Sequence, residues 1–415
     1  MKKILLVLAA FSFFGCQDII NLDRPEDSLY LLDGISSPAE RMFVSFWTGM
    51  NHNYVFWDID PTDWDRVYRE FRPKFAALDD LEDEDEIFQR LYEYFTAVTW
   101  NLIDGHFSME LDLLNIDIVP SMNRFLERIA QEGIALAESE YIEDQTNLME
   151  LLIASPLFSE RSYYQTEAFV DAGDFSVFAG KIPFSGGQGG SILYLYFSEF
   201  IWSKIFENTD PYLAANEATI TAIWDYFMDN LYAPDVKGVI VDVRGNGGGR
   251  ISDLSYLWGQ MFSREQYHLA YNRQKMGDGR MDHSPLLPFY IFNDPENTRD
   301  LQVPLVILTN KFSASCAEMS TLFVRSLPNG HHVGGTTWGA MGGITDNVFF
   351  NAGSFSSIGI ELTFTPSVQV ISLNGTNYEG RGIPPDHPVP FNFAEFNRGR
   401  DTRLEKAIEV VVANQ

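Results

Sequence analysis

Residues 236–250 read VKGVIVDVRGNGGGR, and this stretch decides the fold class. Its first half is a short, nearly continuous apolar run, as expected for a strand that is covered on both faces of a sheet. Its second half places Gly245 and Gly247–Gly249 directly after that strand, so backbone N–H groups lie uncovered at the carboxyl edge of the sheet. Such a loop can bind an anion.

Similar apolar runs lie on either side of this stretch. SILYLYF (191–197) and VPLVILTN (303–310) also have the texture of buried strands, and helical patterns separate the three runs. This alternation predicts an α/β fold with a parallel sheet. Further strands are predicted within 347–372, followed by a closing helix at 402–414.

Two kinds of anion are candidates for binding to the glycine loop. A nucleotide pyrophosphate is disfavoured, because a G-x-G-x-x-G frame counted from Gly245 places Arg250 at its sixth position. The other candidate is the transient oxyanion of an acyl centre, which two backbone donors stabilise as charge develops. A plain glycine-rich turn remains the alternative without catalysis.

Ser315 follows the run at 303–310 and precedes a helical pattern that Pro328 ends, so it lies at a strand-to-helix junction. The free N–H groups and the positive end of a helix dipole favour a developing negative charge at such a junction. Ser315 is therefore a candidate nucleophile, and a simple helix N-cap is the alternative. A helix start also lowers the pKa of a thiol, but the neighbouring Cys316 is more simply explained as a small buried hydrophobe.

Composition restricts the class of partner. The chain has 415 residues, of which 45% are hydrophobic, and its formal net charge is -29. Such a charge repels phosphate backbones, so we expect no nucleic-acid partner. The acidic run at 79–86 lacks the ligand spacing and central glycine of a calcium loop, and we expect no metal site there.

The first 15 residues have the pattern of a targeting segment. Lys2 and Lys3 precede an apolar run that is too short to span a membrane stably. Because the run ends in Gly15 and Cys16, it resembles a bacterial lipoprotein signal, in which the cysteine becomes lipidated. We therefore expect a signal peptide at 1–15, a polar tether at 16–36 and a membrane anchor at Cys16.

The remaining chain divides into three predicted parts. Residues 37–108 form a helical cap, 109–190 an irregular and partly helical middle segment, and 191–415 the α/β core. In the cap, apolar residues recur at helical spacing up to Leu102. The motif that follows, Asp104-Gly105-His106, has the composition of a helix C-cap, with His106 as the next residue.

Three ordered motifs resemble one known family. They are GVIVDVRGNGGG (238–249), VPLVILTNKFSASCAE (303–318) and VGGTTWGAMGG (333–343). Together they are similar to the serine peptidases of the C-terminal processing and tricorn-core group, whose core is related to the crotonase and Clp protease folds. The resemblance extends to DGH (104–106) and to YEGRGIPPDHPV (378–389), but no PDZ domain is recognisable between 109 and 188.

The resemblance implies a set of site residues. The nucleophile of the family matches Ser315, and its oxyanion donors match the N–H groups of Gly248, with Gly247 next, and Cys316. Ala340 stands where the C-terminal processing branch has its lysine base.

In the tricorn-like branch, a histidine base and a carboxylate replace the lysine. These match His106 and Glu379, with Asp386 as the alternative carboxylate. No metal or cofactor is implied.

The sequence therefore predicts a cell-envelope serine peptidase that cleaves a peptide or protein substrate. The alternative is a catalytically silent module of the same fold that binds a peptide or another ligand, and the missing lysine favours it. A short distance between the Ser315 and His106 side chains would favour the peptidase.

Overall fold

A computed structural model gives the structure of the chain. The described residues are 32–111, 116–120, 145–165, 175–185, 189–207, 216–277, 279–345 and 353–415. The predicted signal peptide, Cys16 and a helical pattern at 122–139 lie outside these ranges.

The described elements alternate between helices and strands. The helices are α2 (Pro38–Asn53), α3 (Trp64–Ala76), η1 (Ala77–Asp80), α4 (Glu84–Thr99), α7 (Gln145–Ala154), α8 (Trp202–Phe206), α10 (Glu217–Asn230), α11 (Asp253–Trp258), η2 (Gly259–Met261), α12 (Cys316–Ser326), α14 (Phe393–Phe396) and α15 (Thr402–Ala413). The strands are β1 (Ser108–Leu111), β2 (Ile116–Ile118), β3 (Glu160–Gln165), β4 (Ser176–Pro183), β5 (Ser191–Phe197), β6 (Val236–Asp242), β7 (Gln266–Gln274), β8 (Leu287–Phe292), β9 (Leu305–Thr309), β10 (Gly330–Gly334), β11 (Phe355–Ser357), β12 (Ile360–Phe364), β13 (Val368–Ser372) and β14 (His387–Pro388). Within the described ranges, no helix combines the length and the apolar composition needed to cross a membrane.

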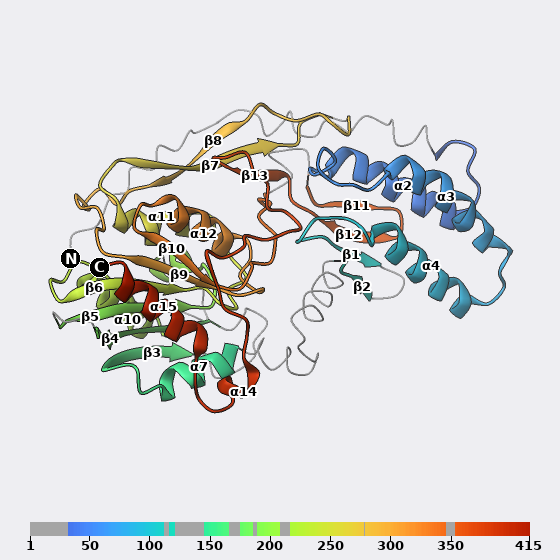
Figure 1. Ribbon diagram of the computed structural model, residues 1–415. Coiled ribbons are helices and arrows are strands. Elements are labelled where there is room, and N and C mark those ends of the chain that lie inside the picture. The colour runs from blue at the N-terminus through green and yellow to red at the C-terminus, as the bar shows by residue number, and fades with distance from the viewer. Residues whose placement is uncertain are drawn as a thin grey trace.

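A seven-stranded sheet forms the core, with the order β14-β10-β9-β6-β5-β4-β3 (Figure 1). Strands β5, β6, β9, β10 and β14 pair in parallel, and β3 and β4 add antiparallel strands at one edge. The three apolar runs of the sequence are β5, β6 and β9, so the predicted α/β class is confirmed.

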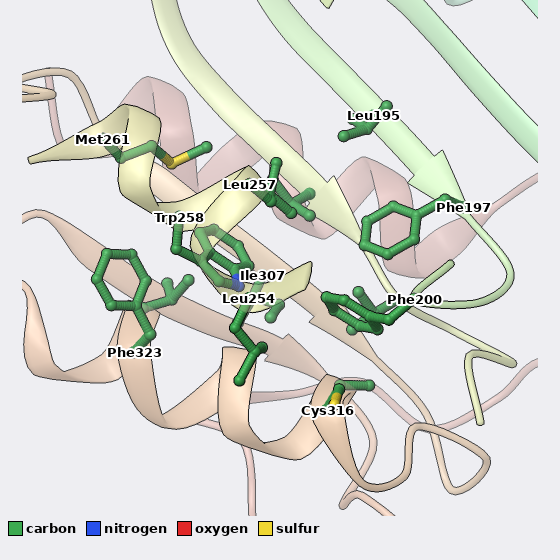
Figure 2. Packing of buried hydrophobic residues seen from close by; sticks show 14 of the residues in the cluster. Leu195, Phe197, Phe200, Leu254, Leu257, Trp258, Met261, Ile307, Cys316 and Phe323 are labelled. Atoms are coloured by element: carbon green, nitrogen blue, oxygen red, sulfur yellow. The ribbon is translucent and has the colours of Figure 1, made fainter. Parts of the chain in front are cut away.

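Helices cover both faces of this sheet, which explains why its strands are apolar without alternation. Val239 and Val241 of β6 pack with α8, α10, α11 and α12, whereas Ile240 between them packs with α7 and α15 on the opposite face. Successive side chains of a strand point to opposite faces, so a strand between two layers of helices needs apolar residues at every position. Figure 2 shows part of the first layer.

The edge of the core differs from the predicted boundary at residue 191. The segment 109–190 was expected to be irregular and partly helical, yet it supplies β3 and β4 to the large sheet, together with helix α7. Strand β4 is buried along most of its length because it pairs with β5 over seven residue pairs. This pairing is a tertiary contact that local sequence patterns do not encode.

The cap has a hydrophobic core of its own. Helices α2, α3 and α4 pack against a four-stranded sheet with the order β11-β12-β1-β2 (Figure 1). Strand β1 follows the cap helices in sequence but pairs with β12, from the C-terminal part of the chain. The cap is therefore joined to the core by chain segments from both ends of the sequence, and the DGH motif lies just before β1 at this junction.

Candidate active site

Two loops meet at the carboxyl ends of adjacent strands. Strands β6 and β9 pair in parallel, so the glycine loop after β6 and the loop at 310–315 after β9 emerge from the same edge of the sheet. The Ala314 N–H donates to the Asn246 carbonyl at 2.9 Å, which joins the two loops directly. In open α/β sheets, this edge is the usual place for a ligand site.

Ser315 has a strained backbone. Its φ of 53° makes it the only non-glycine residue with positive φ in the described part of the chain. A non-glycine residue in such a conformation costs on the order of 1–3 kcal/mol, and it persists only where the surroundings impose it. Here the Ser315 N–H donates to the Ala340 carbonyl at 3.0 Å and to Glu318 Oε2 at 3.3 Å.

The glycine loop lies directly against the Ser315 side chain. A Cβ placed on Gly248 would be 2.5 Å from Ser315 Cβ and 3.0 Å from its Oγ, so only glycine fits at this position. However, the Gly248 N–H donates to Asn246 Oδ1 at 2.8 Å. Within the described structure, the N–H groups of Gly247 and Cys316 donate to no partner, which leaves them available to an oxyanion.

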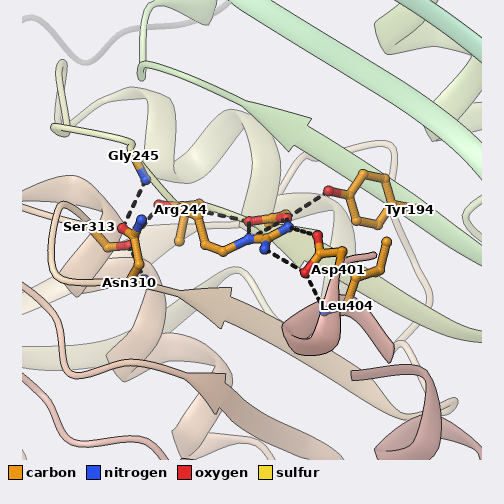
Figure 3. Close-up of polar contacts among 9 residues, drawn as sticks. Tyr194, Arg244, Gly245, Asn310, Ser313, Asp401 and Leu404 are labelled. Atoms are coloured by element: carbon orange, nitrogen blue, oxygen red, sulfur yellow. Dashed lines mark hydrogen bonds and ion pairs between the residues drawn. The ribbon is translucent and has the colours of Figure 1, made fainter. Parts of the chain in front are cut away.

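Ser313 joins the two strand ends rather than facing the glycine loop. Its hydroxyl donates to the Val243 carbonyl at 2.7 Å and accepts from the Asn310 N–H, and the residue is fully buried (Figure 3). The Asn310 side-chain oxygen also accepts from the Gly245 N–H at 3.0 Å. These bonds fix the spacing between the glycine loop and the loop that carries Ser315.

A buried ion network supports the start of the glycine loop. Arg244 binds Asp242 at 2.6 Å and Asp401 at 2.8 Å, and Tyr194 donates to Asp242 (Figure 3). The two carboxylates hold the pKa of Arg244 well above its usual range despite its burial. Asp401 is also the N-cap of α15, so this network connects the glycine loop to the last helix.

The Cys316 side chain points into the core, beside Phe200 and Leu254 (Figure 2). Only 2% of the residue is exposed, and its thiol donates to the Gly249 carbonyl. Burial raises the pKa of this thiol to about 12. Cys316 is therefore the small buried hydrophobe that its sequence suggests.

The DGH motif packs against the segment that follows β10. A Cβ on Gly105 would be 2.5 Å from both Ala340 Cβ and the Gly339 carbonyl oxygen, and the Trp338 indole donates to the Gly105 carbonyl. The expected C-cap role is wrong, because α4 already ends at Thr99. Glycine is needed at position 105 because a side chain there would collide with Ala340 and the Gly339 carbonyl.

Glu379 lies beside the histidine, whereas Asp386 does not. One side-chain nitrogen of His106 and one carboxylate oxygen each of Asp104 and Glu379 lie within 4.8 Å of one another. Asp386 instead forms an ion pair with Arg325 at 2.8 Å. Of the two carboxylates that the sequence left open, the structure thus places only Glu379 next to His106.

Backbone donors hold the Glu379 carboxylate. Oε1 accepts from the Gly105 N–H at 2.8 Å, and Oε2 accepts from the N–H groups of Met341 and Gly342 at 2.9 Å each. Burial and the neighbouring Asp104 raise the pKa of Glu379 well above its usual range. Burial also lowers the pKa of His106 to about 4, so its imidazole is neutral at neutral pH.

Ser315 and the residue before His106 both contact Ala340. Ser315 N–H bonds to the Ala340 carbonyl, and Gly105, the residue before His106, packs on the Cα and Cβ of Ala340. No hydrogen bond joins the two side chains, and His106 Nδ1 has no partner in the described structure. A base and its nucleophile often stand further apart without substrate than they do during the reaction.

Asp104, His106 and Glu379 also offer the ligand types of a metal site. Both oxygens of Glu379 also accept backbone N–H groups.

Glu318 is a site residue that the sequence analysis missed. It is fully buried, and its carboxylate accepts from Thr337, from the N–H groups of Gly339 and Ala340, and from Ser315. It therefore fixes the backbone of Ser315 to the segment that packs against Gly105. The S-x-x-E spacing of a capping box, Ser315 to Glu318, was the available signal.

Comparisons with known proteins match parts of this chain. Residues 197–389 match the model of peptidase family S41. The matched region contains the glycine loop, Ser315 and Glu379, and it does not include His106. The match covers less than half of this chain.

Curated relatives share the same region. The Tricorn protease of Thermoplasma volcanium is 25% identical over 203 residues, which are 49% of this chain and 17% of that protein. The Tricorn protease of Thermoplasma acidophilum is 23% identical over 176 residues, 42% of this chain and 14% of that protein. The matches thus span less than a fifth of the length of these relatives.

One solved structure resembles nearly the whole chain. The crystal structure of a candidate peptidase from Parabacteroides merdae superposes with a TM-score of 0.60 at 20% identity, covering 92% of this chain and 98% of that one. This likeness confirms the fold, including the cap as well as the core.

Proposed function

We propose that this protein is a serine peptidase that cleaves peptide bonds through an acyl-enzyme on Ser315. The observation that carries the proposal is the strained backbone of Ser315, held against a glycine loop at the start of α12. Strain of this kind is concentrated at functional sites, because it needs support from the surrounding structure. A serine that served only as a helix cap would need no such conformation.

In the proposed mechanism, His106 accepts the proton of the Ser315 hydroxyl as Oγ attacks the carbonyl carbon of the substrate. The backbone N–H groups of Cys316 and Gly247, which have no partner in the described structure, hold the oxyanion that forms. Gly248 contributes a further donor only if its N–H leaves Asn246.

Collapse of the tetrahedral intermediate breaks the C–N bond, and the His106 imidazolium gives its proton to the leaving amine. Water then attacks the acyl-enzyme with His106 as base, which regenerates the Ser315 hydroxyl. Glu379 orients the imidazole and stabilises its cationic form through both steps. This assignment is supported by the His106 nitrogen and the Glu379 oxygen, which lie within 4.8 Å of each other, and by the backbone bonds that fix Glu379.

Hydrolysis of an unfolded protein substrate tests the proposal. The wild-type chain should cleave it, and both Ser315→Ala and His106→Ala should lose the activity while remaining folded. Activity of the purified Ser315→Ala variant at the wild-type level would refute the mechanism.

Two observations favour the second candidate, a ligand-binding module without catalysis. His106 makes no side-chain hydrogen bond to Ser315, and the Gly248 N–H is already occupied by Asn246. A module of this kind would bind peptides with equal affinity in the wild-type and Ser315→Ala proteins and would cleave them in neither.

We further propose that the peptidase acts at the bacterial cell envelope and is anchored through a lipid on Cys16. The proposal rests on the basic start, the apolar run and Gly15-Cys16 of the sequence. Cells fed a radiolabelled fatty acid should label the wild-type protein and not the Cys16→Ser variant. Equal labelling of both would exclude this anchor.

A further inference from the structure

Asp104 is a second carboxyl group in the site, and nothing in the proposed mechanism uses it. The side chain is fully buried. Its Oδ1 accepts from the His106 N–H at 2.8 Å, and its Oδ2 accepts from the Thr365 hydroxyl at 2.7 Å. Asp104 therefore fixes the backbone of the histidine to the residue that follows β12 in the cap sheet.

Asp104 and Glu379 also lie close to each other. Their carboxylate oxygens are within 4.8 Å, in the same cluster as the His106 nitrogen. Glu379 is only 3% exposed, and no lysine or arginine forms an ion pair with it in the described part of the chain. Two buried carboxylates at this separation repel each other strongly, and one of such a pair normally retains a proton.

Ionisable groups near the pair include a tyrosine and a further acid. Tyr54, after α2, is buried and donates to Asp60, and Glu318 of α12 is a further buried acid. His106 belongs to the same cluster. Burial and the Coulombic effect of Asp104 raise the pKa of Glu379, which agrees with a retained proton.

We propose that Asp104 is a positioning residue that shares a single proton with Glu379, so that the pair presents one negative charge to His106. A histidine base needs one negative charge beside it, because that charge stabilises the imidazolium. Two ionised carboxylates in a buried site would instead cost folding free energy. The inference concerns the site proposed above, and the proton itself is measurable without any activity.

Infrared spectroscopy tests the shared proton directly, because a protonated carboxyl group has a carbonyl stretch distinct from that of a carboxylate. The wild-type protein at pH 7 should show this band, and both Asp104→Asn and Glu379→Gln should lose the intensity of one carboxyl group. Asp386→Asn is the control, since Asp386 pairs with Arg325 on the surface. Any band from buried Glu318 stays in all variants.

Kinetics provide the second readout. Each single variant keeps one ionisable carboxyl group, which then ionises and faces His106, whereas the double variant Asp104→Asn with Glu379→Gln keeps none. The fall in kcat for the double variant should therefore exceed the product of the two single falls by at least about tenfold. If Asp104 has a structural role only, the fall in kcat of the double variant should equal the product of the two single falls.

The outcomes separate the two proposals. Loss of the band in both single variants supports the shared proton. Loss in Glu379→Gln alone, an unchanged spectrum in both, or no such band in the wild type overturns it. If Asp104→Asn does not fold, Asp104→Ser, whose hydroxyl can still accept the His106 N–H, takes its place. A wild-type protein that shows the band but cleaves no peptide would refute the proposed function and leave the shared proton standing.

Discussion

The burial of His106 predicts how much stability the folded protein loses at acid pH. The imidazole lies in a site that lowers its pKa from 6.5 to about 4. A difference of about 2.5 pH units corresponds to roughly 3.4 kcal/mol between the neutral and charged forms. The folded protein therefore resists protonation of this side chain, whereas the unfolded chain accepts the proton near pH 6.5.

The sign of the effect on stability follows from linkage. Because the folded pKa is below the unfolded one, the unfolded state binds more protons between pH 6.5 and 4. The contribution of His106 is thus fully present above pH 6.5 and is lost as pH falls towards 4, by up to roughly 3 kcal/mol. The proposed negative charge of the Asp104–Glu379 pair acts in the opposite direction and makes this an upper value.

Two measurements check the titration. Urea unfolding at pH 7, 5.5 and 4 should show a smaller loss of stability in His106→Asn than in the wild type, and NMR of the His106 ring should give its midpoint. The variant identifies the resonance. A His106 midpoint at or above 6.5, with equal acid sensitivity of both proteins, would refute burial as the controlling effect.

The remaining predictions concern the loops that support Ser315. Gly248→Ala should lower kcat by about a hundredfold or more, because the new Cβ would lie 2.5 Å from Ser315 Cβ. Gly399→Ala is the control, since Gly399 also has a positive φ but has open space around it. Equal kinetics of the two variants would contradict the packing argument. Asp401→Asn should destabilise the protein by about 3 kcal/mol in urea unfolding, because it removes one of the two negative charges that pair with buried Arg244. A cost below about 1 kcal/mol would exclude that role.

The strands and the helix around Ser315 were predictable because their signals are local. A strand covered on both faces is apolar at every position, and the glycines that follow β6 stand next to it in the sequence. The strand-to-helix position of Ser315 could be predicted for the same reason. The core of the site is thus encoded in two short segments.

The parts that could not be predicted depend on contacts between distant segments. Gly105 was interpreted as a helix C-cap. The structure shows instead that a glycine is needed there because Ala340, which lies far along the chain, leaves no room for a side chain. The choice between Glu379 and Asp386 also required the fold, because both occur in one segment and only packing separates them. Asp104 gives no local signal beyond a polar residue before a glycine.

The most direct test of the central claim is labelling with a fluorophosphonate probe, followed by mass-spectrometric mapping of the modified residue. The account predicts modification of Ser315 in the wild-type protein, none in Ser315→Ala, and retained labelling in Ser313→Ala and Cys316→Ala wherever these variants fold. Absence of labelling in the wild type, or a label on another residue that persists in Ser315→Ala, would contradict it.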